Sequence, residues 1–144
     1  MSVLKIPYSK LQAQRIPMAP GSPKSAPYLA SDDVRKIALP TMEGIHFELV
    51  QNIVSLEAKG NYTFLYLESG KQLLVCKTLM EMEEMLKNAV QFVRIHRSTT
   101  INLNKISKYI KGKGGYVIME DGSTRNVSAG RKNEFFDALK KYYG

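Results

Sequence analysis

Alternating apolar and polar residues dominate the middle of the chain and predict β-strands. Two runs rich in β-branched and aromatic residues, Ile53–Lys59 and Tyr62–Glu68, are separated by the turn-forming pair Gly60-Asn61. A second turn pair, Ser69-Gly70, separates the latter run from Gln72–Cys76. The sequence therefore predicts two consecutive antiparallel hairpins.

A helical pattern follows these hairpins. Thr78 and Glu81 have the spacing of a capping box, in which each side chain binds the backbone N–H of the other residue. Apolar residues then recur at steps of three and four positions, at Leu79, Met82, Leu86 and Ala89. We expect a helix that begins after Thr78, has one apolar face and ends at Asn88.

Short strand-like segments fill most of the remaining sequence. They are Phe92–Ile95, Thr99–Ile101, Lys105–Lys111, Tyr116–Glu120 and Ser123–Val127. A final helix is expected from Ala129 to Tyr143, with Ser128 as its N-cap. Strands and helices do not alternate regularly, so the pattern favours a mainly β fold of about ten short antiparallel strands with two short helices.

Proline usage sets the N-terminal part of the chain apart. All six prolines of the 144-residue sequence lie at or before Pro40, and the segment Pro17–Pro27 is rich in proline, serine, glycine and alanine. Such a composition is typical of a flexible or polyproline-like linker. We therefore assign residues 1–36 to a tail and residues 37–144 to a folded domain.

Charge is distributed unevenly along the chain, whose formal net charge is +8. Residues 1–40 hold six basic and two acidic groups (+4), residues 41–90 four and seven (−3), and residues 91–144 eleven and four (+7). A domain with one positive part suits a polyanionic partner, either nucleic acid or a lipid surface.

Several kinds of site are disfavoured. Cys76 is the single cysteine, so there is no intrachain disulfide and a reducing compartment, the cytoplasm, is expected. No apolar run is long enough for a membrane helix, and charges and prolines interrupt the place of a secretory signal. With two histidines and no spaced set of ligands or catalytic groups, we expect no metal, no cofactor and no enzymatic activity.

The segment Phe92–Asn102 has the most unusual candidate chemistry, because apolar residues flank Arg94, His96, Arg97 and Ser98. Strand alternation places Arg94 and His96 on one face, with a projecting turn at His96–Ser98. Arginine can grip a phosphate or read guanine O6 and N7. A solvated strand end with a hydrogen-bonded histidine explains the same spacing equally well.

A second candidate is the predicted hairpin tip that carries Lys59 and Asn61. Asparagine can bind adenine N6 and N7 in a bidentate manner. Because Gly-Asn is also an ordinary turn pair, a purely structural role is the favoured explanation for this tip.

A third candidate is the start of the last helix, with Ser128, Arg131 and Lys132. Backbone N–H groups there favour an anion, and exposed basic residues on a capped helix are the alternative. Cations at a helix N-terminus oppose the helix dipole, which favours a partner slightly. Lys111 and Lys113 lie in a glycine-rich stretch that lacks the spacing of a phosphate loop, so a hairpin turn explains them better.

The order of these segments resembles a LytTR-type (LytR/AlgR family) DNA-binding domain of bacterial transcriptional regulators. The resemblance covers about residues 37–142, and its specific part is FVRIHRSTTIN followed by LNKI. The segments IVSLEAKGNYT, KTLMEMEEML and DGSTRNVS, with the terminal helix, complete it. The resemblance implies three small antiparallel sheets with short helices.

The resemblance also implies binding of duplex DNA by loops that enter successive major grooves, usually by two copies on direct repeats. It implies DNA contacts near Asn61, at His96, Arg97 and Ser98, and around Ser128–Lys132. Many such domains have an arginine one or two residues after the serine aligned with Ser128. Here those positions hold Ala129 and Gly130, and the first arginine is Arg131.

Together these features predict a stand-alone, sequence-specific transcriptional regulator, with phosphate attraction from Lys59, Lys111, Lys113 and Lys132. A receiver domain precedes such modules in full-length regulators, and residues 1–36 are too few to form one, so phosphorylation-driven control within this chain is not expected. The expected partners are duplex DNA and a second copy or another regulatory protein, and no membrane. The alternative is a protein-interaction module that sequesters another regulator through the tail or the helix Thr78–Asn88.

Overall fold

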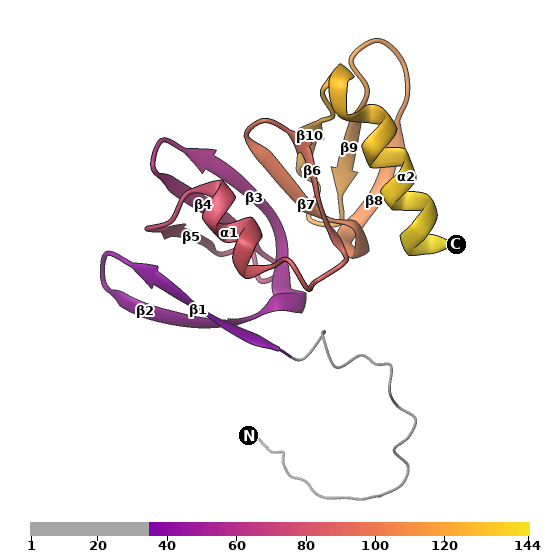
Figure 1. The fold of residues 1–144 in the computed structure, drawn as a ribbon. Coiled ribbons are helices and arrows are strands. Elements are labelled where there is room, and N and C mark those ends of the chain that lie inside the picture. The colour runs from indigo at the N-terminus through magenta and orange to yellow at the C-terminus, as the bar shows by residue number, and fades with distance from the viewer. Residues whose placement is uncertain (1–34) are drawn as a thin grey trace, which may run out of the picture. The chain divides into compact units, whose positions relative to one another are not determined.

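The computed structural model describes residues 35–144, which form one compact unit. Residues 35–144 form ten strands in three antiparallel sheets, with two α-helices and short 3₁₀ turns (Figure 1). This architecture confirms the mainly β fold expected from the sequence. The predicted tail, apart from its last two residues, lies outside the described residues.

The strands and helices follow one another in a simple order. They are β1 (Lys36–Thr41), β2 (Gly44–Leu49), β3 (Ile53–Lys59), β4 (Tyr62–Leu67), β5 (Gln72–Val75), α1 (Leu79–Met85), β6 (Phe92–His96), β7 (Thr99–Asn102), β8 (Ile106–Ile110), β9 (Tyr116–Met119), β10 (Thr124–Asn126) and α2 (Lys132–Tyr143). The 3₁₀ turns are η4 (Val50–Asn52), η5 (Leu103–Lys105) and η6 (Ala129–Arg131).

The largest sheet has five strands in the order β5-β4-β3-β7-β6. The two predicted hairpins β3–β4 and β4–β5 are present, and the β6–β7 hairpin joins them through antiparallel pairing of β3 with β7. The buried side chain of Asn102 reinforces this junction, because its amide nitrogen donates to the Ile53 carbonyl at 2.9 Å. The smaller sheets are β1-β2 and β10-β9-β8.

Two hydrophobic clusters stabilise these sheets. The first joins β1, β3, β4, β5 and α1 and includes Leu39, Leu56 and Met82. The second joins β6, β7, β9 and α2 and includes Ile95 and Phe135. Strand β3 contributes to both clusters, so the central strand links the two halves of the domain.

The capping box predicted for the first helix is present. Thr78 Oγ1 accepts the Glu81 N–H at 3.1 Å, and Glu81 Oε1 accepts the Thr78 N–H at 2.9 Å. The predicted end at Asn88 is wrong, because α1 stops at Met85 and Leu86 leaves the helical conformation. Leu86 and Ala89 remain buried in a tight turn, which is why the apolar pattern continues past the helix.

The predicted cap of the last helix is also wrong. The Ser128 side chain caps no N–H group, and the 3₁₀ turn η6 separates it from α2. The backbone of Ser128 is used instead: its N–H donates to the Ile95 carbonyl at 2.9 Å and its carbonyl accepts the Arg131 N–H at 3.0 Å. This residue therefore fixes the corner between β10 and α2.

Candidate nucleic-acid interface

Four loops point to one side of the domain in Figure 1. They are the β3–β4 tip, the β6–β7 tip, the β8–β9 loop and the corner between β10 and α2. Backbone hydrogen bonds join neighbouring loops: Ala58 N–H to Ser98 O (2.8 Å), Ser128 N–H to Ile95 O (2.9 Å) and Val127 N–H to Gly115 O (3.1 Å). Loops that are far apart in the sequence thus form one continuous edge.

The β6–β7 tip is held by the ring of His96. Its Nδ1 accepts the Ser98 N–H at 3.2 Å and lies 3.0 Å from Ser98 Oγ. Because a backbone N–H can only donate, Nδ1 is the acceptor of this bond, which leaves Nε2 as the donor of the ring. His96 therefore offers one N–H donor, which suits a phosphate oxygen or guanine O6 and N7.

Arg97 lies at the extreme of the same tip. Its side chain is exposed and forms no hydrogen bond or ion pair with other residues of the range 35–144. A free guanidinium in this position can grip a phosphate or read guanine in a bidentate manner.

The prediction that Arg94 and His96 share one strand face is wrong, because the pairing of β6 with β7 shifts register between them: Arg94 faces Glu83 of α1, whereas His96 lines a hollow beside β10. The Arg94 guanidinium is already bound within the protein. Nε and one terminal nitrogen donate to the two carboxylate oxygens of Glu83 at 2.7 and 2.9 Å. The other terminal nitrogen donates to the Arg97 carbonyl at 2.9 Å. The structure therefore does not bring the Arg94 side chain together with the exposed groups of the tip.

The β3–β4 tip lies beside the β6–β7 tip, through the Ala58–Ser98 hydrogen bond. Gly60 takes a left-handed conformation there, with φ of 61°, and Asn61 is exposed. The ammonium of Lys59 lies 6.0 Å from the centroid of the Phe64 ring and remains exposed. Both predicted residues of this tip are thus accessible to a large ligand.

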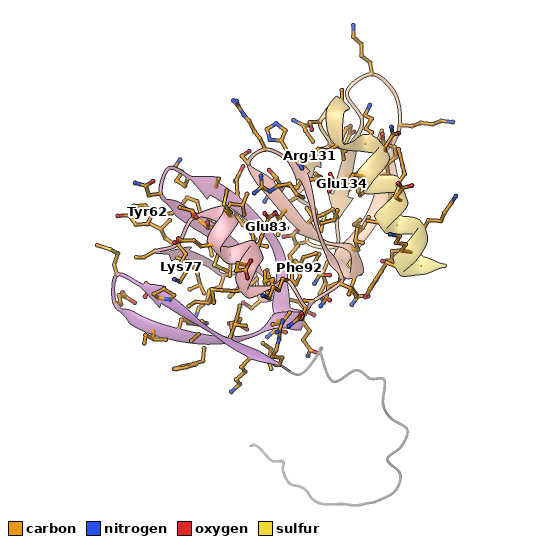
Figure 2. The ribbon with its side chains drawn as sticks, in the orientation of Figure 1. Tyr62, Lys77, Glu83, Phe92, Arg131 and Glu134 are labelled. Carbon is orange, nitrogen blue, oxygen red and sulfur yellow. The ribbon has the colours of Figure 1, made fainter. Side chains whose placement is uncertain are left out.

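The remaining predicted basic residues lie on the other two loops. Arg131 and Lys132 are half-buried at the corner, and the Arg131 guanidinium lies 3.5 Å from the Glu134 carboxylate (Figure 2). Lys111 and Lys113 are exposed on the β8–β9 loop. Gly115 ends that loop, where a Cβ atom would overlap the Tyr109 hydroxyl, so the loop needs a glycine at this position.

Comparison with known proteins identifies the family. Residues 43–140 match the LytTr DNA-binding domain. The chain belongs to this family. A LytTr DNA-binding domain from Bacillus cereus has a similar fold, with a TM-score of 0.62 and 24% identity over 72% of this chain and 95% of that chain. A search of curated proteins gives no match.

Membership of the LytTr family implies DNA binding and a role in transcriptional regulation. It confirms the resemblance stated for the sequence. It also agrees with a binding function rather than an enzymatic one. Among the described residues no cluster of potential metal ligands occurs, and no helix there is long and apolar enough to cross a membrane.

The LytTr domain carries two further side chains at the β3–β4 end of the sheet that the sequence did not mark as site residues, the exposed Tyr62 and the half-buried Lys77. Tyr62 follows Asn61 and remains 41% exposed at the β3–β4 tip (Figure 2). Lys77 lies at the same end of the sheet, because its carbonyl accepts the Thr63 hydroxyl at 2.8 Å. Strand β5 runs antiparallel to β4 and returns the chain to the β3–β4 tip, which places Lys77 there. The local sequence pattern does not show this neighbourhood.

A polar hollow of about 160 Å³ lies between the β6–β7 tip and β10. Residues of the β6–β7 hairpin line one side of it: His96, Ser98 and Thr99. The other lining residues were not singled out from the sequence: Glu57, Thr124, Arg125 and Asn126. The segment DGSTRNVS predicts strand β10 but not where this strand lies in the fold. Strand β10 pairs only with β9, and tertiary packing brings it to the β6–β7 tip.

Arg125 lines this hollow and stacks on Tyr66. Its guanidinium lies 4.6 Å from the centroid of the Tyr66 ring, and the Tyr66 hydroxyl donates to Glu57 at 3.1 Å. Burial, followed by the hydrogen bond and charge of Glu57, raises the pKa of Tyr66 above its usual value. Tyr66 therefore stays a neutral donor, and Glu57, Arg125 and the exposed Asn126 line the same hollow.

Proposed function

We propose that this LytTr domain is a sequence-specific, duplex-DNA-binding transcriptional regulator that inserts loops into successive major grooves. The observation that carries the proposal is the continuous edge of four joined loops, which present exposed donors and lysines on one side. A major groove admits a two-stranded β ribbon as well as a helix, so the β6–β7 hairpin has a suitable width. We place this function in the cytoplasm.

The residues divide into two groups by their chemistry. Arg97, His96 and Asn61 can read base edges, because Arg97 and Asn61 offer donors in exposed turns and His96 lies directly before one of these turns. Lys59, Lys111, Lys113 and Lys132 supply charge for phosphates, which fixes position but not sequence. Ser128 and Arg131 support the corner of the edge, where Arg131 can reach a phosphate or a base.

The asparagine of β10 extends the base-reading group. Asn126 is exposed and lines the polar hollow beside Ser98. Its amide can bind adenine N6 and N7. Occupation of one half-site would use one copy of the domain, and direct repeats would bind two copies.

Selection from random duplexes tests this function. We expect the chain to enrich one short motif, present as a direct repeat, and to do so at two salt concentrations. Equal recovery of all sequences would contradict sequence-specific binding. Such recovery together with a stable complex with another regulator would favour the alternative, a sequestering module.

The structure bears on where that alternative could dock. The apolar face of α1 packs inside the first hydrophobic cluster through Leu79, Met82 and the following Leu86. Met80 on the other face is 75% exposed. The helix thus has one exposed apolar side chain rather than a free apolar face, which makes DNA binding the better supported function.

A further inference from the structure

A carboxylate on α1 is connected to the exposed tip of the β6–β7 hairpin. The two oxygens of Glu83 accept from Arg94 at 2.7 and 2.9 Å, and Oε2 also accepts the Thr100 hydroxyl at 2.8 Å. The Arg94 side chain is 19% exposed and the Glu83 side chain 32% exposed. Bidentate, charge-assisted pairs of this kind fix geometry better than single hydrogen bonds.

The connection continues from Arg94 to the backbone of the tip. Its third donor binds the carbonyl of Arg97, the residue whose side chain is free for DNA. Just before the tip the pairing of β6 with β7 shifts register between Arg94 and His96. Such an irregularity re-aims the side chains that follow it, and it removes regular pairing from the segment that Arg94 holds.

We infer that Glu83 and Arg94 are positioning residues, which set the conformation of His96–Ser98 before DNA arrives. Arg94 acts through the Arg97 carbonyl and does not itself contact DNA. A tip that is ordered in advance loses less conformational entropy on binding and presents its donors in one geometry. This inference rests on the proposed function for its DNA-binding consequence, but its effect on the free protein does not.

Replacement of Glu83 by glutamine separates positioning from simple electrostatics. The loss of a negative charge near DNA raises affinity if Glu83 acts only through its charge. If Glu83 positions the tip, Glu83→Gln lowers affinity for the selected duplex roughly tenfold, the size expected when hydrogen bonds to a charged group are lost. Affinity for random duplex changes less, because phosphate attraction remains.

Glu84→Gln is the matched control, because it removes the same charge from the next residue of α1. Glu84 is exposed and pairs with Lys87 at 2.9 Å, away from Arg94. We expect this variant to bind as tightly as the wild-type chain or slightly more tightly. Equal or tighter binding by both variants would overturn the inference while leaving the proposed function intact.

The salt dependence of binding by Arg94→Gln decides whether Arg94 touches DNA. A lost phosphate contact reduces the slope of log K against log salt by about 0.9. We expect a weaker complex with an unchanged slope. A reduced slope would assign Arg94 to the DNA contacts and overturn its positioning role.

Hydrogen exchange in the free protein tests positioning without DNA. The Ala58 amide donates to the Ser98 carbonyl, so its protection reports the order of the tip. We expect faster exchange at Ala58 in Glu83→Gln, relative to the amides of β9, and no change in Glu84→Gln. Unchanged protection of Ala58 in Glu83→Gln would overturn the inference even if the chain bound no specific DNA.

Discussion

At the residue scale, two arginines three positions apart have opposite surroundings. Arg94 has acceptors on Glu83 and on the Arg97 carbonyl, whereas the Arg97 side chain has no partner among residues 35–144. A guanidinium that is already bound must break those bonds to reach a ligand, whereas a free one needs only to be ordered. Of the two arginines, Arg97 is therefore the better placed to bind DNA under the proposed function.

Arg97→Ala should weaken binding to the selected duplex by about 1–3 kcal/mol if Arg97 makes a bidentate base contact. Discrimination against duplexes changed at one base pair should fall with it. Lys71→Ala removes the same charge from the exposed β4–β5 turn, at the opposite end of the sheet, and serves as the control. Fluorescence-anisotropy titrations measure the affinity and the discrimination of each variant. Equal effects of Arg97→Ala and Lys71→Ala would remove Arg97 from the base contacts.

At the scale of elements, β2 has an alternation opposite to that of an ordinary surface strand. Ile45 and Phe47 are each 63% exposed, whereas His46 and Glu48 point to the protected side. Glu48 accepts from His46 at 2.8 Å and from Asn52 at 2.7 Å. The inward polar groups are thus satisfied by one another, which allows the strand to carry apolar residues outward.

Glu48→Gln should lower the free energy of unfolding at neutral pH, by on the order of 1 kcal/mol, because it loses a hydrogen bond to a charged acceptor. Burial alone would raise the pKa of Glu48, but the hydrogen bonds from His46 and Asn52 and the charge of His46 outweigh it and lower the pKa below 4.5.

A lowered pKa in the folded state stabilises the protein above the pKa of the unfolded chain, and this advantage is lost as the pH falls through the folded value. The difference between wild type and Glu48→Gln should therefore be full at neutral pH and shrink below about pH 4.5. Urea unfolding at several pH values measures it. A difference that grows toward acid pH would contradict this role of Glu48.

The elements differ in how well the sequence predicted them. Strands β3 to β10 follow from their β-branched, aromatic and other apolar residues and from the turn residues between them, although β7 buries three polar side chains and no position of β10 is buried. Strands β1 and β2 were not predicted individually, since β2 turns apolar residues outward. The start of α2 depends on a tertiary hydrogen bond from Ser128 to Ile95, which local spacing does not contain, whereas α1 ends in a local turn after Met85 that keeps the apolar spacing of a helix.

At the scale of the whole molecule, the proposed DNA-binding site combines loops from different parts of the sequence, which lie over both hydrophobic clusters. The sequence marked three segments and the lysine loop by their chemistry, but it carried no information about which loops are neighbours. For the same reason it did not show that Arg94 pairs with Glu83, which lies eleven positions away on another element. It missed Arg125 and Asn126, whose position depends on packing between sheets.

The lysines of the β8–β9 loop should control the salt dependence of binding. Lys111→Gln/Lys113→Gln should reduce the slope of log K against log salt by about 0.9 for each phosphate contact that is lost. The ratio of affinities for selected and random duplex should stay the same, because phosphate contacts carry no sequence information.

Lys140→Gln/Lys141→Gln makes the same change of charge in the last turn of α2, at the end opposite the loops in Figure 1. This control should leave the slope close to that of the wild type. A slope that responds equally to both double variants would indicate attraction by total charge and not by contacts of the β8–β9 loop.

The hydrogen bonds that join the four loops all run between backbone groups. Backbone N–H and C=O groups are present whatever side chain the residue carries, so exchanging Asn61, Arg97 or Arg131 leaves these bonds in place. Under the proposed function, target preference and stability are therefore largely separate properties of this domain. Replacing side chains on the edge would then change the preferred DNA sequence without rebuilding the scaffold that aligns them.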